Sequence, residues 1–258
     1  MVTTQLPSNA ADGGPASVVD LTSVMVKVRS RLDCSERSGP WKDVTTQRLR
    51  AAAPWRTFRW FKGQKHYSGT YWAATCAGHV TYESRLELGR LLLADFDKSV
   101  SCVVSQPFLL EAVVEGQVRR HVPDYLLFTD DGPVVVDVKP AAQILKPVVA
   151  RTFAWTREVV DSRGWSYEVW PGDASVHLSN IRFLAGFRRH QYFREEAIER
   201  MSQPHLIGMT VREAISQEQH LSADIARQML LMHVLWRQQF AVDLLRPLSG
   251  ARVLERPV

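Results

Sequence analysis

Residues 121–139 constrain the fold most strongly, because their pattern predicts two strands joined by a tight turn. The first strand is expected over about residues 118–128 and the second over about 133–139. The second strand contains Val134–Val136, a β-branched run typical of a strand that is buried on both faces. The residues Asp130–Pro133 between them favour a turn. We therefore expect a hairpin in which the start of the first strand lies beside the end of the second.

This hairpin would bring three polar side chains together at one end, namely Asp124, Asp137 and Lys139. Carboxylates are the oxygen ligands that Mg²⁺ prefers, and a lysine beside them can hold a water or a phosphate oxygen. Phosphodiester hydrolysis needs such parts, because a metal activates water and cations stabilise the developing charge. The alternative is that Asp124 caps a turn and Lys139 is a solvated strand end, since short motifs recur by chance.

Upstream of the hairpin, residues 82–93 predict an amphipathic helix. Glu83 stands at its expected start, where a negative charge suits the helix dipole. Glu87 lies four residues on and shares that face. For Glu87 we favour an ordinary surface ion pair with Arg85 or Arg90, because helix carboxylates are usually solvated. A helix-borne Glu83 that faced the hairpin would complete an acidic triad.

These motifs, taken in order, resemble the PD-(D/E)xK nuclease superfamily. Within it, the match is to the TnsA-like endonuclease subunit of heteromeric (Tn-type) transposases. The resemblance extends over about residues 55 to 190 and includes two flanking segments, 58–69 and 180–184. The motifs that carry it are Glu83, Gln106-Pro107-Phe108, His121-Val122-Pro123-Asp124-Tyr125 and Asp137-Val138-Lys139.

The resemblance implies a role for each of these residues. Glu83 would be the helix glutamate, Asp124 the metal-binding aspartate and Lys139 the catalytic lysine. Asp137 stands where relatives carry Glu, Gln or Asp, so its carboxylate is an implied metal ligand, as is the backbone carbonyl of Val138. The implied cofactor is Mg²⁺, for which Mn²⁺ can substitute. The implied fold class is α/β, with a restriction-endonuclease-like αβββαβ core in which helices flank a mixed sheet.

Two further residues are expected to support this site. Gln106 would lie in the active site or face DNA, although a glutamine before a proline at a strand end is also structurally ordinary. His121 is expected to make local hydrogen bonds rather than to bind a metal.

Cations and aromatic residues interleave over residues 41–66, which contain the single acid Asp43. We expect the aromatic rings to pack on the core and the cations to contact DNA, because one-signed charge attracts phosphates. The net charge of +5 and pI of about 9.3 agree with a phosphate partner. The expected DNA-binding residues are Arg56, Arg59, Lys62, Lys65 and Lys146.

The chain is expected to divide into four parts. Residues 1–40 are predicted to be a disordered tail, in which only about 19–32 would form a short docked helix or strand. Residues 41–81 form the basic and aromatic segment, and 82–190 the nuclease core. Residues 191–258 predict a helical, winged-helix-like module, in which 240–245 would pair with 251–254 as a hairpin and which binds DNA or protein.

Other classes of protein fit the sequence less well. It has no apolar run long enough to span a bilayer and no signal pattern at its start. Its three cysteines have neither a disulfide framework nor zinc-ligand spacing, so we expect a protein of the reducing cytoplasm. The resemblance implies that it is bacterial and DNA-associated.

The expected function is therefore a Mg²⁺-dependent DNA endonuclease. The resemblance implies that it cleaves the non-transferred strand at transposon ends in double-stranded DNA. Its implied partners are a DDE-type transposase subunit and an AAA⁺ ATPase regulator. Two alternatives stay open: a stand-alone nuclease of restriction, repair or phage defence, and a non-catalytic DNA-binding or assembly subunit.

Overall fold

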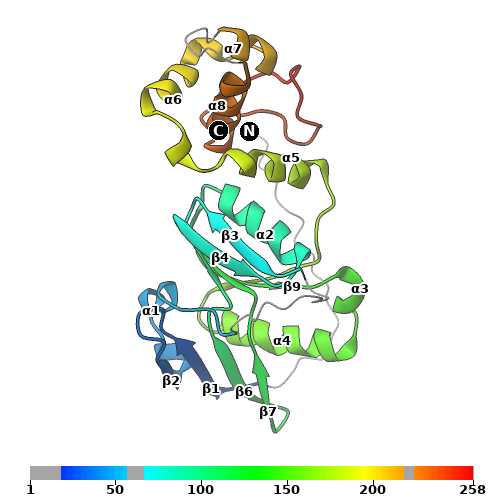
Figure 1. Ribbon diagram of the computed structural model, residues 1–258. Coiled ribbons are helices and arrows are strands. Elements are labelled where there is room, and N and C mark those ends of the chain that lie inside the picture. Colours follow the sequence, from blue (N-terminus) through cyan, green and yellow to red (C-terminus); the bar gives the residue numbers. More distant parts are fainter. Residues whose placement is uncertain (1–18, 57–66, 218–223, 258) are drawn as a thin grey trace.

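The computed structural model describes residues 19–56, 67–217 and 224–257, and it is a mixed α/β structure (Figure 1). A central four-stranded sheet has the order β10-β9-β8-β5. Its strands are β5 (Val100–Ser105), β8 (Tyr125–Thr129), β9 (Gly132–Val138) and β10 (Ser166–Trp170). The pairs β5–β8 and β8–β9 are antiparallel, and β9–β10 is parallel.

Two helices cover opposite faces of this sheet, as expected of a mixed sheet flanked by helices (Figure 1). Helix α2 (Arg85–Phe96) buries Leu91 and Leu92 against one face. Helix α4 (Pro147–Asp161) buries Trp155 and Val159 against the other. A parallel pair of strands needs a long crossover connection, and α4 supplies it between β9 and β10.

A second sheet has the order β2-β1-β6-β7. It contains β1 (Val19–Arg29), β2 (Glu36–Pro40), β6 (Leu109–Val114) and β7 (Gln117–His121). The short docked helix or strand expected over about residues 19–32 is present as β1. The predicted disordered tail is wrong for residues 36–40, which form β2, and residues 1–18 lie outside the described chain. The apolar alternation Val24, Val26, Val28 explains β1, because it gives this strand one buried face.

The strand predicted over residues 118–128 is in fact two strands in two different sheets. Strand β7 ends at His121, and β8 begins at Tyr125. Pro123 lies between them, and a proline has no N–H to donate to a strand ladder. The second predicted strand, over 133–139, is confirmed as β9.

The segment before α2 contains a hairpin of β3 (Gly69–Ala73) and β4 (Gly78–Tyr82). Its turn is held by the buried carboxylate of Asp95 on α2. Asp95 accepts hydrogen bonds from the Tyr71 hydroxyl (2.7 Å) and from the backbone N–H groups of Ala74 (3.1 Å) and Thr75 (2.8 Å). The shorter helices of the chain are η1 (Trp41–Asp43), α1 (Thr46–Arg50), α3 (Ala141–Ile144), η2 (Ala185–Phe187), η3 (His190–Tyr192) and η4 (Pro204–Leu206).

The C-terminal part contains α5 (Val176–Leu184), α6 (Glu195–Met201), α7 (Val211–Gln217) and α8 (Asp224–Trp236). The predicted hairpin of 240–245 with 251–254 does not form as two strands in the described residues. Isolated bridges join Thr210 to Val253 and Ala241 to Glu255 instead. Hydrogen bonds from a buried side chain hold the loop between these bridges, because the Asn180 amide donates to the carbonyls of Leu244 (2.9 Å) and Arg246 (2.8 Å).

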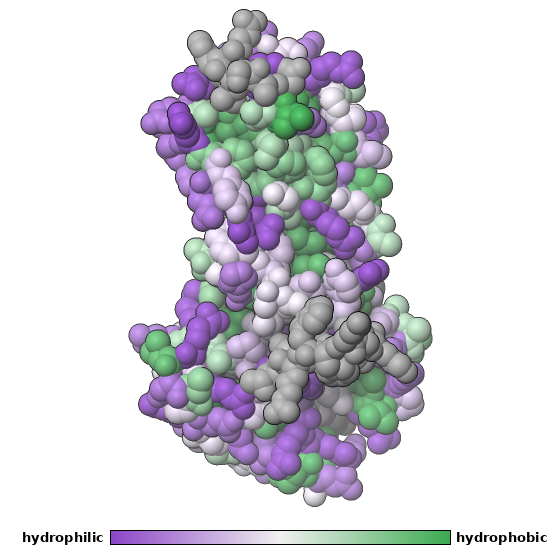
Figure 2. All heavy atoms as spheres, in the orientation of Figure 1, coloured by the Kyte–Doolittle hydropathy of each residue, from purple (hydrophilic) through white to green (hydrophobic). Residues whose placement is uncertain are grey.

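These helices share one hydrophobic core with α2 and the facing side of the central sheet. Helix α5 packs on both α2 and α8, so the predicted boundary at residue 190 cuts through a continuous core. Figure 2 shows apolar residues gathered over the C-terminal helices in its upper part. Among the described residues, no helix has the length and apolar content to cross a membrane.

Candidate functional site

The hairpin of β8 and β9 brings Asp124 and Asp137 together, as the sequence predicts. Tyr125 pairs with Val136, so Asp124 stands opposite Asp137 at the next position of the ladder. The backbone N–H of Val138 donates to Asp124 Oδ2 at 2.7 Å. A third strand end joins them, because the backbone N–H of Gln106, directly after β5, donates to the Asp124 carbonyl at 2.8 Å.

Asp124 lies in an environment that disfavours its charge. Burial, then the charges of Asp137 and Glu87, raise the pKa of Asp124 to about 8, although the Val138 hydrogen bond and the Lys139 charge oppose the rise. Within the described ranges no hydrogen bond reaches its second oxygen, Oδ1. A half-buried carboxylate among other carboxylates, with one oxygen available, favours the binding of a cation.

Asp137 differs from Asp124, because both of its carboxylate oxygens accept hydrogen bonds. The side chain of Asp137 is only 3% exposed. His121 Nε2 lies 2.9 Å from Oδ1 and 2.8 Å from Oδ2, and the Tyr167 hydroxyl donates to Oδ2 at 2.5 Å. Burial and the Asp137 charge raise the pKa of Tyr167 well above its usual value, so Tyr167 stays a donor. His121 was expected to make local hydrogen bonds, but its partner lies 16 positions away, on a strand of the other sheet.

Glu83 is tied to Gln106 and Arg56 on the other side of the site. Gln106 Nε2 donates to Glu83 Oε1 at 2.9 Å, and the Arg56 guanidinium lies 3.3 Å from Glu83 Oε2. The backbone N–H of Arg56 also donates to Gln106 Oε1 at 3.0 Å. Gln106 is 4% exposed and has a φ of +45°, a strained conformation for a residue with a side chain. Three of the predicted residues therefore form one connected network.

The expectation that Glu87 forms a surface ion pair is wrong. Glu87 is buried and accepts hydrogen bonds from the backbone N–H of Glu83 (2.7 Å) and the Ser84 hydroxyl (3.0 Å). Burial raises the pKa of Glu87. Arg90 instead makes a bidentate pair with Glu168, with both distances at 2.8 Å. The sequence carried a signal for this, because Ser84-x-x-Glu87 has the spacing of a helix capping box.

Ser84 caps α2, so Glu83 precedes the helix rather than standing within it. The position of Glu83 is still fixed, because its backbone N–H donates a hydrogen bond to the Glu87 carboxylate. Tyr167 is a site residue that no local pattern marks, because only the pairing of β9 with β10 places its hydroxyl on Asp137.

The remaining predicted residues lie around this network. Lys139 is half-buried directly after β9, and its N–H donates to the Trp170 carbonyl at 3.0 Å. Lys146 is exposed at the start of α4. Arg59, Lys62 and Lys65 fall outside the described residues.

The described aromatic residues of the basic segment pack on the fold, as expected. Trp41 is buried, and its indole N–H donates to the Val159 carbonyl of α4 at 2.8 Å. Trp55 is half-buried beneath the Arg29 guanidinium, which lies 5.3 Å from the ring centroid. Phe58, Trp60 and Phe61 lie outside the described residues.

The carboxylates of this site supply only some of the ligands that a hard divalent cation needs. Across the described ranges, no three His, Cys, Asp or Glu side chains form a group that could hold a metal ion. Mg²⁺, however, is commonly bound through one or two carboxylates together with waters and substrate phosphates. Asp124, with its available oxygen and raised pKa, fits such an open site, and Glu83 is linked to it through Gln106, whose side chain bonds Glu83 and whose backbone N–H bonds the Asp124 carbonyl.

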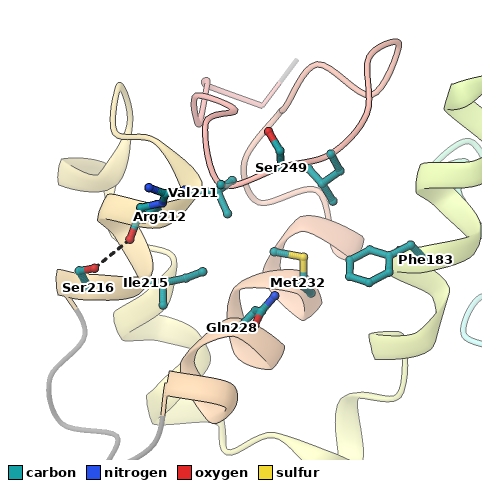
Figure 3. A pocket seen from close by; sticks show the side chains of 10 residues that line it. Phe183, Val211, Arg212, Ile215, Ser216, Gln228, Met232 and Ser249 are labelled. Carbon is teal, nitrogen blue, oxygen red and sulfur yellow. Dashed lines mark hydrogen bonds between the residues drawn. The ribbon is translucent and has the colours of Figure 1, made fainter.

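A separate cavity of about 360 Å³ lies among the C-terminal helices (Figure 3). Phe183 of α5, Ile215 of α7 and Met232 of α8 line it, with Gln228 and Ser216 as polar neighbours. It shares no lining residue with the carboxylate network, so the two are distinct features.

The chain matches no protein-family model, and no curated protein matches it.

Proposed function

We propose that the chain is a Mg²⁺-dependent DNA endonuclease of the PD-(D/E)xK type. The observation that carries this proposal is the placement of Asp124 opposite Asp137, with Lys139 at the end of the same strand and Glu83 linked through Gln106. The central sheet and its two covering helices support it too, because they follow one another along the chain as α2, β5, β8, β9, α4 and β10, which is the αβββαβ order of that core with β6, β7 and α3 inserted.

Each residue of the site has a role in this proposal. Asp124 and Glu83 would hold the ion, and Gln106 fixes the Glu83 carboxylate. A bound Mg²⁺ would supply an activated water and stabilise the leaving oxygen. Lys139 would place a positive charge beside the scissile phosphate, where charge develops during hydrolysis.

The TnsA-like role is the more specific part of the proposal. Its support is the ordered motif set together with the C-terminal part of the chain. There α6, the Thr210 bridge, α7, α8 and the Ala241 bridge follow in the order of a winged-helix module. We accordingly propose double-stranded transposon ends as substrate, a DDE-type transposase as partner, an AAA⁺ ATPase as regulator, and a cytoplasmic, DNA-associated location.

One observation favours the non-catalytic alternative, in which the fold serves DNA binding or assembly. Asp137 and Glu83 both have protein partners. A scaffold that had lost catalysis would bind DNA through its cations but would take up no divalent ion at Asp124.

Calorimetric titration of Mn²⁺ into the full chain tests the proposal without any partner subunit. We expect binding by the wild type and none by Asp124→Ala. Glu196→Ala is the matched control, because Glu196 is exposed on α6 and its loss also removes one negative charge. Equal binding by wild type and Asp124→Ala, or none by the wild type with duplex DNA present, would reject the metal site.

Cleavage of duplex DNA in Mn²⁺ is the second measurement, with the transposase partner added where one is encoded nearby. Asp124→Ala and Lys139→Ala should each abolish strand cleavage while DNA binding persists. Full cleavage by Asp124→Ala would exclude this residue from the active site.

A further inference from the structure

Asp124 and Asp137 stand opposite each other but differ in what their oxygens contact. Asp124 accepts a single hydrogen bond, from the Val138 N–H, in the described part of the chain. Asp137 accepts from His121 on both oxygens and from Tyr167 on one of them. The two carboxylates are therefore not equivalent candidates for a metal ligand.

The surroundings of Asp137 explain why it is held so firmly. His121 ends β7 of the second sheet, and Tyr167 comes from the neighbouring strand β10. The His121 ring lies edge-on to two aromatic rings of α4, with centroids 6.4 Å from Phe153 and 6.1 Å from Trp155. Asp137 thus joins three strands at a position that is almost fully buried.

Turning Asp137 toward an ion would break these contacts. The Tyr167 hydroxyl is in a buried side chain, and a buried donor without a partner is costly. Asp124 would lose nothing comparable, because its Oδ1 accepts no hydrogen bond from the described residues. Binding an ion through Asp124 therefore breaks fewer hydrogen bonds than binding it through Asp137.

We infer that Asp137 is a positioning residue and not a metal ligand, and that Asp124 is the aspartate of this pair that holds the divalent ion. The inference rests on the proposed function, and it divides the two aspartates of the site into two roles. Asp137 holds His121 and Tyr167 and keeps the ends of β7, β9 and β10 in register, while its charge adds to the attraction for a cation at Asp124.

Replacement of each aspartate by cysteine tests the division. A thiolate ligand prefers a soft ion such as Cd²⁺, and its bond to Cd²⁺ gives an ultraviolet absorption band. We expect Cd²⁺ to produce this band in Asp124→Cys and not in Asp137→Cys. The wild type sets the background, because it contains Cys34, Cys76 and Cys102.

Three results are distinguishable. A band in Asp124→Cys alone supports the division. Bands of similar strength in both variants overturn it and leave the metal site of the proposed function in place. No band in either variant, together with no Mn²⁺ binding by the wild type, overturns the division and the metal site together.

A second measurement covers the case in which Asp137→Cys does not fold. The His121 Nε2 proton, hydrogen-bonded to Asp137, should give a downfield proton resonance in the wild type. We expect this resonance to stay in place when Mg²⁺ saturates the protein, because Asp137 keeps its partners. Its loss or a large shift would show that Asp137 turns to the ion and would overturn the inference.

Discussion

At the scale of single residues, the site concentrates buried negative charge without an equal number of cations. Asp124 is flanked by Asp137 and Glu87, and both raise its pKa. Of the cations nearby, Lys139 lowers that pKa, while Arg56 pairs with Glu83. The site is thus built at a cost in stability, as is common where charge is needed for function.

Asp124→Asn should stabilise the metal-free protein at neutral pH, by about 2 kcal/mol or more. The pKa of Asp124 is raised to about 8 from its usual value of 3.8, so the native state loses stability as pH rises between those values. The gain on substitution should therefore be small at pH 4, grow with pH, and level off above pH 8. Thermal unfolding with a chelator present measures it, with Glu196→Gln as the control.

A gain of equal size at pH 4 and pH 9 would contradict this explanation, because an uncharged Asp124 at low pH already resembles asparagine.

For His233 of α8, the expected dependence of stability on pH is opposite to that for Asp124. Burial lowers the pKa of His233, and the nearby His190 and Arg237 add to the effect, while its hydrogen bond to the Phe187 carbonyl (2.7 Å) opposes it. Its Nε2 has no hydrogen-bond partner within the described residues. Because the native state holds this ring neutral, stability should fall as pH drops below about 6.5, the usual pKa of histidine.

His233→Asn tests this dependence, because the asparagine amide can still donate to the Phe187 carbonyl but does not titrate. Between pH 7 and pH 5, the melting temperature of the wild type should fall more than that of His233→Asn. Equal falls in both proteins would assign the acid sensitivity to other groups.

At the scale of elements, polar side chains on α2 decide where the preceding hairpin and Glu83 lie. Asp95 near the end of α2 holds the β3–β4 turn, and Ser84 and Glu87 at its start hold the backbone of Glu83. Helix α2 therefore positions the candidate site at one end and its supporting hairpin at the other.

Asp95→Ala should destabilise the fold by about 2–4 kcal/mol, because it leaves the Tyr71 hydroxyl and two backbone N–H groups without their acceptor. Urea unfolding measures the loss. Asp97→Ala is the matched control, since Asp97 is exposed two residues further on and its side chain bonds only locally to Ser99. Similar losses in the two variants would show that Asp95 has no special role.

At the scale of the whole molecule, we expect the C-terminal helices and the central sheet to unfold as one unit, because they share one hydrophobic core. Leu178, Ile181 and Leu184 of α5 are all at most 4% exposed, within the core that joins α2 to α8. Burial of this kind is the main stabilising contribution to a fold.

Truncation after residue 190 should therefore expose this apolar face of α5. The shortened chain is expected to bind a hydrophobic dye and to lose its cooperative thermal transition. A fragment that melts cooperatively at the temperature of the full chain would show that residues 191–258 form an independent domain.

The sequence by itself determined the elements whose signals are local. The Asp130–Pro133 turn fixes the hairpin of β8 and β9, and hairpin pairing is enough to place Asp124 beside Asp137. Helix α2 follows from its apolar periodicity, and the spacing of Ser84 and Glu87 already contained its cap.

Only the tertiary structure decided what each carboxylate contacts. His121 and Tyr167 reach Asp137 from two different strands, and Gln106 reaches Glu83 from a distance of 23 positions along the chain. It also decided that residues 19–40 pair as strands and that the C-terminal hairpin reduces to isolated bridges. Strand partners and hydrogen bonds of this kind depend on how separate elements pack, and no local pattern specifies that packing.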